Sequence, residues 1–365
     1  MTPSPPPRID DGEAFELYRE CSIHELGRRA FDISIAHHPE PDRTYVVDRN
    51  INYSNLCTAR CIFCNFKADP GDANGYVLGL DEVGRKIDEL IAIGGTQVLM
   101  QGGLVPAETL GLDWYLDLLR FIKHRFPSIH IHAFSPPEVF AFHQMFGMSV
   151  REVLLRLQEA GLDTIPGGGA EILVDRVRDK ISRGKTRTAE YLTVMREAHK
   201  IGMRTSATMM FGHIETVPER IEHLRRIREL QDETGGFTAF ILWTFQPENT
   251  ALGRVPQFPP DYAGLPDGRH LKPAGAAEYL RMLALARIYL DNVANIQASW
   301  VTQGPKIGQL ALFFGANDMG SVMMEENVVS AAGTTYRLDE AAIRRLIADA
   351  GWQPRKRNCY YERVD

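Results

Sequence analysis

The sequence predicts an α/β barrel of the TIM type, complete or partial, with helical segments flanking it at both ends. From about Tyr45 onward, short apolar runs alternate with longer helical patterns, and the apolar runs lack a polar face, as in parallel strands covered by helices. Six or more such units follow one another without a charged central linker. Glycine and polar residues follow successive strands, as expected of loops that share one rim of a barrel. An open doubly wound sheet is the competing fold.

The helix and strand pairs follow in order along the chain. Helices are expected over 81–95, 112–126, 149–161, 188–202, 217–236 and 276–290. The strands that follow them are expected over 96–100, 129–134, 162–166, 203–211, 237–243 and 294–301. The first helix begins at Asp81 and stops at Gly94 and Gly95, and the second stops before Pro127. These start and stop signals separate each helix from the next strand.

Helical segments flank the barrel in this interpretation and pack against it rather than form separate domains. The proline-rich start of the chain lacks the apolar core of a signal peptide and is predicted to be flexible. The predicted organisation is a tail over 1–11, an N-terminal helical segment over 12–44, the barrel over 45–325 and a C-terminal helical segment over 326–365.

Composition narrows the class of protein. The 365 residues are 44% hydrophobic and 24% charged, as in a globular protein rather than a disordered one. The formal net charge of −6 argues against a broad nucleic-acid-binding surface, and no apolar run approaches the length of a membrane span. Five cysteines, an odd number and mostly clustered, do not match a secreted disulfide framework and indicate a reducing, cytoplasmic location.

Three of the cysteines, Cys57, Cys61 and Cys64, fall within eight residues, in a loop expected on the active rim. Thiolates are soft ligands that suit zinc, copper(I) or iron–sulfur clusters. Structural zinc requires four protein ligands, and residues 57–66 contain no histidine to complete a set. A [4Fe–4S] cluster normally has four cysteines, so three would leave one iron open to a ligand that is not protein. A zinc knuckle or incidental thiols remain as alternatives.

The C-x3-C-x2-C spacing resembles the signature of the radical S-adenosylmethionine (SAM) superfamily. The resemblance implies that the three cysteines hold a [4Fe–4S] cluster, that SAM chelates the open iron, and that a 5′-deoxyadenosyl radical abstracts hydrogen from substrate. The family often has a glutamate where this chain has Leu104, so an acidic contribution from that position is not expected. The SAM-binding residues implied by the family's motifs are Phe66, Gln101, Gly102, Gly103, Glu171, Met210 and His213.

Longer phrases, among them "LDTIPGGGAEIL" and "FILWTFQPENT", resemble the cyclic dehypoxanthinyl futalosine synthases, a family of the futalosine route to menaquinone. The resemblance runs from about Asp48 to Ser321 and into the C-terminal "RNCYY". It implies an oxidoreductase that removes hydrogen from the ribose C4′ of dehypoxanthine futalosine and adds the carbon radical to the benzoate ring. A flavodoxin- or ferredoxin-type electron donor is the implied protein partner.

Polar and aromatic residues at strand ends are the candidate substrate contacts in this family context. The candidates are His132, Ser135, Glu138, Glu215, Trp243, Thr244, Gln246, Asn317 and Asp318. Lys306, near an expected helix start, is a further candidate for an anionic group. The final loss of a ring proton needs a base, and no residue is identified for it.

Three rival functions stay open. A sister radical SAM enzyme, such as aminofutalosine synthase or a component of deazaflavin (FO) synthase, would share every cofactor feature. A zinc metalloenzyme would use the same cysteines for a different metal. A non-catalytic binding protein has the weakest support, because polar and glycine-rich loops follow nearly every strand.

Overall fold

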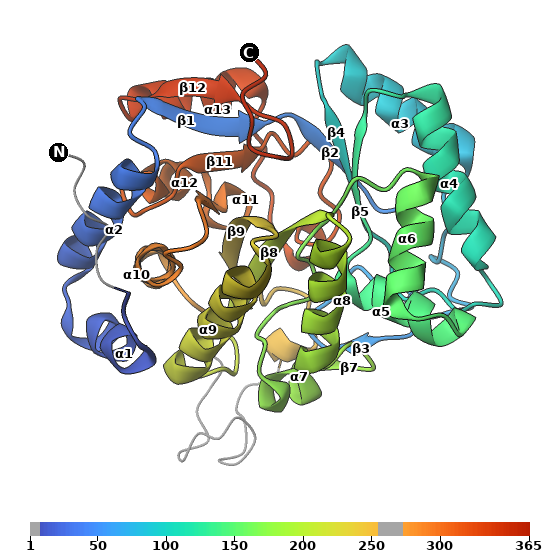
Figure 1. Cartoon of the computed structure of the whole chain (residues 1–365), viewed down its shortest axis with the longest axis horizontal. Helices are drawn as coiled ribbons and strands as arrows, with labels where there is room; N and C mark the ends of the chain where they lie inside the picture. Colours follow the sequence, from blue (N-terminus) through green and yellow to red (C-terminus); the bar gives the residue numbers. More distant parts are fainter. Residues whose placement is uncertain (1–7, 255–272) are drawn as a thin grey trace.

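The computed structural model describes residues 8–254 and 273–365, in which a curled parallel sheet lies inside a layer of helices (Figure 1). Ten strands lie in the spatial order β12-β1-β11-β10-β9-β8-β6-β5-β4-β2, and every neighbouring pair is parallel. The bounds are β1 Asp42–Val46, β2 Asp48–Ile51, β4 Gln97–Met100, β5 His130–Ala133, β6 Thr164–Ile165, β8 Arg204–Phe211, β9 Phe237–Thr244, β10 Asn295–Gln297, β11 Asp318–Ser321 and β12 Gln353–Lys356. The predicted TIM-type barrel is confirmed.

The barrel closes through a single extended run, because β1 and β2 are separated only by Val47. The carbonyl of Val46 accepts a hydrogen bond from Val322 on one edge, at 3.1 Å. The carbonyl of Val47 accepts one from Thr96, before β4, on the opposite edge at 3.3 Å. The run thus pairs with β11 on one side and with β4 on the other. Counted as one strand, and with β12 outside, it completes the eight-stranded ring of a TIM barrel.

Helices cover the outside of the ring (Figure 1). Their bounds are α3 Leu80–Ala92, α4 Leu112–Arg125, α5 Pro136–Phe146, α6 Val150–Ala160, α7 Asp175–Ile181, α8 Thr188–Lys200, α9 Val217–Thr234, α10 Ala276–Tyr289, α11 Trp300–Gln303 and α12 Pro305–Ala311. Helix α3 turns an apolar stripe toward the sheet, formed by Val83, Ile87 and Leu90, which are all fully buried. The core is therefore one continuous layer between sheet and helices.

The polar phrase "SPPE", which follows the strand predicted over 129–134, is the start of α5 rather than a rim loop. Ser135 caps the helix, and Pro136 and Pro137 occupy its first turn. Proline fits there because the amide protons of the first turn have no partner within the helix. The carboxylate of Glu138 accepts hydrogen bonds from the Ser135 backbone and hydroxyl, which completes the cap.

The flanking segments pack on the barrel. The N-terminal helices are α1 Asp11–Glu20 and α2 Ile23–His37, and α2 lies against α10. The C-terminal segment was expected to be helical, but besides α13 (Glu340–Asp349) and the short 3₁₀ turn η2 (Ser330–Ala332) it also contributes β12 to the sheet. The four residues of β12, "QPRK", lack the apolar alternation that marks a strand in a sequence.

The flexible tail predicted over 1–11 falls largely outside the described ranges. Of its described part, Arg8 forms ion pairs with Asp232 and Asp291, at 2.6 and 2.9 Å, and Asp10 caps α1. These residues therefore contact the folded protein. Among the helices of 8–254 and 273–365, none is long and apolar enough to cross a membrane.

Candidate active site

A cavity of about 430 Å³ runs along the barrel axis. Residues that directly follow strands line its upper part, among them Gln101 after β4 and Gly167 after β6. Its lower part is lined by Arg357, Cys359 and Tyr361 of the C-terminal segment. The cavity therefore opens at the carboxyl ends of the strands, where barrel active sites lie, and the C-terminal segment fills the opposite end.

All three clustered cysteines line the mouth of this cavity. Cys61 lies in β3 (Arg60–Cys61), which pairs antiparallel with β7 (Ser182–Arg183) outside the main sheet. Cys57 lies on the inner side of the same loop, where the Leu104 amide donates to its sulfur at 3.3 Å. Cys64 turns back over Cys61 through a backbone hydrogen bond of 3.3 Å. The loop thus presents the three thiols to one space.

Burial disfavours a free thiolate at Cys61, so its deprotonation needs a nearby cation. Burial raises the pKa of its thiol to about 12, and the nearby charge of Lys185 opposes that rise only in part. A thiol with such a pKa stays protonated at neutral pH unless a cation stabilises the thiolate. A coordinated metal does this, because it deprotonates a bound thiol outright. No three His, Cys, Asp or Glu side chains of the described ranges converge on a single-ion site.

The glycine turn after β4 packs directly against the cysteine loop. A Cβ on Gly102 would lie 2.4 Å from the Tyr53 ring, and one on Gly103 would lie 2.0 Å from the Leu56 carbonyl oxygen and 2.6 Å from Cys57 Cβ. Only glycine leaves room for this approach. A Cβ on Gly168 would lie 2.3 Å from the side-chain amide nitrogen of Gln101. The turn, the "PGGG" loop and the cysteine loop therefore form one wall.

Glu171 and Lys185 face each other in this wall. Lys185 Nζ lies 3.0 Å from Glu171 Oε1, and Arg178 lies 3.7 Å from Oε2. Burial opposes the charge of Lys185, but Glu171 and Cys61 outweigh it and raise the pKa of the lysine. Glu171 Oε2 accepts no hydrogen bond within the described residues. The wall therefore offers a fixed cation and an available carboxylate oxygen beside the thiols.

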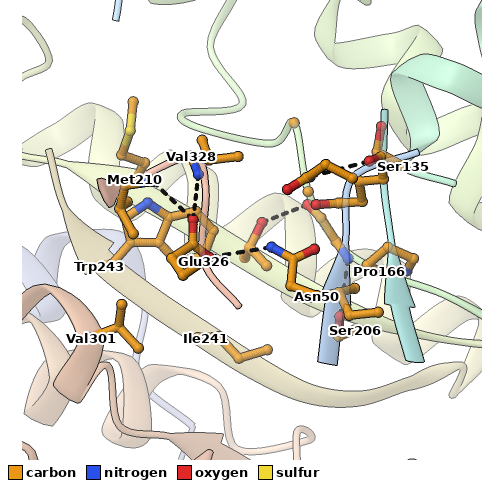
Figure 2. A pocket seen from close by; sticks show the side chains of 18 of the residues that line it. Asn50, Ser135, Pro166, Ser206, Met210, Ile241, Trp243, Val301, Glu326 and Val328 are labelled. Atoms are coloured by element: carbon orange, nitrogen blue, oxygen red, sulfur yellow. Dashed lines mark hydrogen bonds between the residues drawn. The ribbon is translucent and has the colours of Figure 1, made fainter. Parts of the chain in front are cut away.

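The opposite wall is apolar and aromatic, with one carboxylate in it (Figure 2). Trp243 of β9 lies beside Met210 of β8 and close to Glu326, which follows β11. Ile241 and Val301 continue this surface below Trp243 (Figure 2). Such a surface suits an aromatic ring, because flat side chains bury large area against it.

Two predicted substrate contacts, Ser135 and Glu138, line the cavity, but they bond to each other and to the wall. Glu138 Oε1 accepts from the Tyr53 hydroxyl at 2.6 Å and from the Gly102 amide at 3.0 Å. Its Oε2 accepts from the Ser135 amide and hydroxyl. Four donors occupy this carboxylate, so it positions the glycine turn.

His132, Thr244 and Gln246 also line the cavity. Thr164 bonds the His132 ring at 2.7 Å, and burial lowers the pKa of His132 to about 3, so the ring is neutral at neutral pH. The Thr244 hydroxyl accepts from Gln246 at 3.1 Å and from Gln303 at 2.6 Å. These groups can bond a polar ligand only by exchanging present partners.

His213 and Glu215, predicted to contact SAM and substrate, lie outside the cavity wall formed by the described residues. Glu215 accepts from the Gly212 amide and from Arg220 at 2.7 Å, and the His213 ring bonds the Met210 carbonyl and the Ile214 amide. Burial opposes ionisation of Glu215, but His213 and Arg220 outweigh it and lower its pKa. The pair anchors the start of α9 instead of reaching a ligand.

Asn317 and Asp318 were predicted at a strand end on the rim, but Asp318 begins β11, Asn317 directly precedes it, and both lie at the opposite end of the barrel. Arg357 donates to both oxygens of Asp318, at 2.5 and 3.0 Å, and Asn317 binds Arg287 at 3.0 Å. Their polar atoms hold the C-terminal segment and α10 in place. Lys306, the further anion candidate, is exposed on α12 and does not line the cavity formed by the described residues.

Comparisons with known proteins agree with this geometry. Residues 51–227 match the Radical SAM superfamily, and residues 234–365 match the CofH/MqnC C-terminal region. The chain is 45% identical to a cyclic dehypoxanthine futalosine synthase of Halalkalibacterium halodurans, over 97% of this chain and 91% of that protein. It is 43% identical to a 5-amino-6-(D-ribitylamino)uracil–L-tyrosine 4-hydroxyphenyl transferase of Methanosarcina barkeri, over 88% of this chain and 82% of that protein.

The chain belongs to the radical SAM superfamily. Members of this superfamily bind a [4Fe–4S] cluster and SAM, so the chain is an enzyme that uses both. Among solved structures, methylornithine synthase superposes with a TM-score of 0.72 at 17% identity, over 96% of this chain and 95% of that one. The hydrogenase maturase HydG superposes with a TM-score of 0.70 at 14% identity, over 97% of this chain and 74% of that one. Both likenesses concern the fold alone.

The residues of the mouth fit the cofactors of the superfamily. The three thiols have no fourth cysteine among the described cavity residues except Cys359 at the far end. The glycine turn leaves a cradle that a Cβ would fill, and Glu171 Oε2 is a buried acceptor without a donor. Phe66, Gln101 and Met210, predicted for SAM, line the same cavity.

Sequence reasoning missed Lys185 and Glu326, which line the cavity from loops rather than strand ends. It also missed Ser206 and Thr208 of β8, although they alternate with apolar residues in "TSATMMF". That period of two, within a strand buried on both faces, marks the side chains that point into the barrel.

Proposed function

We propose that the chain cyclises dehypoxanthine futalosine to cyclic dehypoxanthine futalosine in menaquinone biosynthesis, as a cytoplasmic radical SAM oxidoreductase. The observation that supports this substrate is the near full-length similarity to the synthase of Halalkalibacterium halodurans. A second synthase of that name, from Streptomyces coelicolor, is 42% identical over 98% of this chain and 86% of that protein. The aromatic wall around Trp243 agrees with a substrate that contains a benzoate ring.

The residues divide into two groups along the cavity. Cys57, Cys61 and Cys64 would hold the cluster, and the glycine turn with Glu171 and Lys185 would hold SAM. Lys185 supplies the positive charge that a carboxylate of the cofactor needs, and Glu171 Oε2 can accept from a hydroxyl or ammonium group. The bound cofactors supply a carbon radical that removes hydrogen from the ribose C4′.

The remaining work of the protein is positioning and exclusion of water. Trp243, Met210 and Ile241 would hold the benzoate ring, while Thr208 and Gln297 offer polar groups to the sugar. Holding the reacting carbons in contact makes the bimolecular step effectively unimolecular. Such positioning lowers the activation barrier by several kcal/mol. The filled lower end of the barrel closes the cavity to solvent from that side, and bound substrate would cover the mouth.

The electron donor we propose is a small acidic protein of the flavodoxin or ferredoxin type. Arg60 and Arg183 are both exposed and are paired in register in the β3–β7 ribbon that contains the buried Cys61. Like charges in such a pair repel, and neither arginine forms an ion pair within the described part of the chain. Asp69, which lies near Arg60, is paired with Lys67. An anionic partner would relieve the repulsion one residue from the cluster.

The test is anaerobic reconstitution with iron and sulfide, followed by addition of SAM, dithionite and dehypoxanthine futalosine. A product lighter than the substrate by two hydrogens, formed with 5′-deoxyadenosine, would support the proposal. A Cys57→Ala, Cys61→Ala, Cys64→Ala variant is the matched control and should bind no cluster. Metal analysis of the wild-type chain distinguishes iron from zinc.

The second candidate is the transferase reaction, because a relative of that name is 43% identical. Incubation of the same preparation with L-tyrosine and 5-amino-6-(D-ribitylamino)uracil tests it. A coupled product from these two compounds, with dehypoxanthine futalosine left unchanged, would replace our proposal by this one.

A further inference from the structure

Four carboxylates of the described residues line the cavity, and they differ in the number of hydrogen-bond donors and cations that contact them. They are Asp48, Glu138, Glu171 and Glu326. Glu138 has four donors, and Glu171 lies against two cations. Asp48 accepts from Ser321 and Gln97 at the start of β2, near the filled end of the barrel. Only Glu326 is both unpaired with a cation and placed among the apolar residues of the upper wall.

The two oxygens of Glu326 have unequal surroundings. Oε1 accepts from the amides of Val328 and Val329, at 2.7 and 2.9 Å, which fixes the carboxylate (Figure 2). Oε2 has one partner, the side-chain amide of Asn50, at a long 3.3 Å (Figure 2). A carboxylate oxygen has two lone pairs, so Oε2 retains capacity toward the cavity.

The environment increases the affinity of Glu326 for a proton. Desolvation raises its pKa, and the neighbouring Glu325 raises it further, while the two backbone donors and Asn50 act against them. Trp243, Met210 and Val328 surround the group without offering a positive charge (Figure 2). A carboxylate with a raised pKa is a better general base than an exposed one.

We propose that Glu326 is the catalytic residue that accepts the proton leaving the aromatic ring of the substrate. This inference rests on the proposed cyclisation. After the substrate's C4′ radical has bonded to a carbon of the benzoate ring, that carbon still bears its hydrogen. The step breaks this C–H bond: the proton passes to Glu326 Oε2 and the bonding pair returns to the ring. The one surplus electron leaves to an iron–sulfur one-electron acceptor, which restores the aromatic ring.

The other polar groups fit this step less well. Glu138 has no free lone-pair direction, because two donors bind each oxygen. His132 bonds Thr164 deep in the barrel, close to Cys359. Among the cavity carboxylates of the described residues, only Glu326 combines an available oxygen with a place beside the surface that suits the ring.

Glu326→Gln tests the assignment with little change of structure. The amide oxygen of glutamine can keep both backbone hydrogen bonds. Its NH2 group can donate to Asn50 Oδ1, which has no partner among the described residues. Glu159→Gln is the matched control: its carboxylate is exposed on α6 and does not line the cavity.

Three quantities are measured for each protein: the substrate dissociation constant by tryptophan fluorescence, 5′-deoxyadenosine, and cyclised product. In wild type and Glu159→Gln we expect equal amounts of the two products. In Glu326→Gln we expect similar substrate affinity and 5′-deoxyadenosine, but about 10²-fold less cyclised product, the scale of a lost general base. Wild-type cyclisation should also fall as the pH drops through the raised pKa of Glu326, and Glu326→Gln should lack this dependence.

Each other outcome overturns the assignment. Equal ratios of the two products in Glu326→Gln and wild type would mean that another group takes the proton. Weaker substrate binding with a parallel fall of both products would mean that Glu326 only positions the substrate. If wild type forms no cyclised product, the proposed function is wrong and the assignment falls with it.

Discussion

Gly103→Ala should displace the first cluster ligand. The added Cβ would lie 2.0 Å from the Leu56 carbonyl oxygen and 2.6 Å from Cys57 Cβ, whereas ordinary contact begins at 3.4 Å. The loop must therefore move by about 1.4 Å, the difference between 3.4 and 2.0 Å. The neighbour is backbone, which cannot rotate away as a side chain can. Overpacking of this kind costs about 1–3 kcal/mol.

The assay is iron bound per chain after anaerobic reconstitution with limiting iron. We expect affinity for iron about 10–100-fold lower, the range observed when groups that orient metal ligands are changed. Gly79→Ala is the matched control, because a Cβ there meets nothing within 4 Å. Iron binding by Gly103→Ala equal to that of Gly79→Ala would refute the idea that the glycine turn holds the cysteine loop in position.

Three further predictions concern charge. Arg60→Glu combined with Arg183→Glu should slow reduction of the cluster by an acidic flavodoxin or ferredoxin about 10-fold at low salt, while turnover driven by dithionite stays unchanged. The control is Arg156→Glu, an exposed arginine of α6. Equal rates of the double variant and wild type with the protein donor would contradict the docking surface. Lys185→Gln should keep the cluster but weaken SAM binding about 10-fold or more, measured by equilibrium dialysis, because a charged hydrogen bond is worth about 1.5–3 kcal/mol. Glu215→Gln should lower the free energy of unfolding, measured in urea at pH 7, by about 3–5 kcal/mol. This loss should shrink as the pH falls below about 4.3, because the lowered pKa of Glu215 stabilises the fold only where the carboxyl of the unfolded chain is ionised. A loss that does not vary with pH would refute this reasoning.

The helices and strands of the repeated units could be predicted from the sequence, because each depends on the pattern of apolar residues within its own segment. The helix predicted over 81–95 and the strand over 96–100 correspond to α3 and β4 within a few residues. Apolar spacing sets which face is buried, and glycine or proline sets where a helix stops. Closure of the ring could not be predicted in the same way. It depends on the run β1–β2 reaching strands that lie far away in the sequence, and β12 is recognisable only by its partner β1.

The wrong placements of Asn317 and Asp318 have a specific cause. Glycine, asparagine and aspartate favour turns, so "GANDMGS" was interpreted as the end of a unit on the rim. Asp318 is instead the first residue of β11, where Arg357 neutralises it. An aspartate inside a barrel is tolerable only with such a partner, and nothing local in the sequence reveals a partner 39 residues away.

Some residues of the candidate site could be predicted from neighbouring residues in the sequence, and others depend on contacts between distant segments. The spacing of Cys57, Cys61 and Cys64 is local, so the cluster loop could be predicted from the sequence. Lys185 and Glu326 enter the cavity from loops whose course depends on packing, and a charged loop residue is usually solvated.

The ion pair between Arg357 and Asp318 at the far end of the barrel holds the C-terminal segment against the strands. Burying Arg357 with Asp318 costs desolvation that apolar residues would avoid, so the pair is weak evidence for stability. It does fix the C-terminal segment: Arg357 also donates to Gln297 of β10, and Cys359 contacts Thr164 of β6. A segment held to strands on several sides of the ring closes it more firmly than one packed by apolar contact alone. Solvent then has to enter the cavity through the mouth, which a bound substrate would cover.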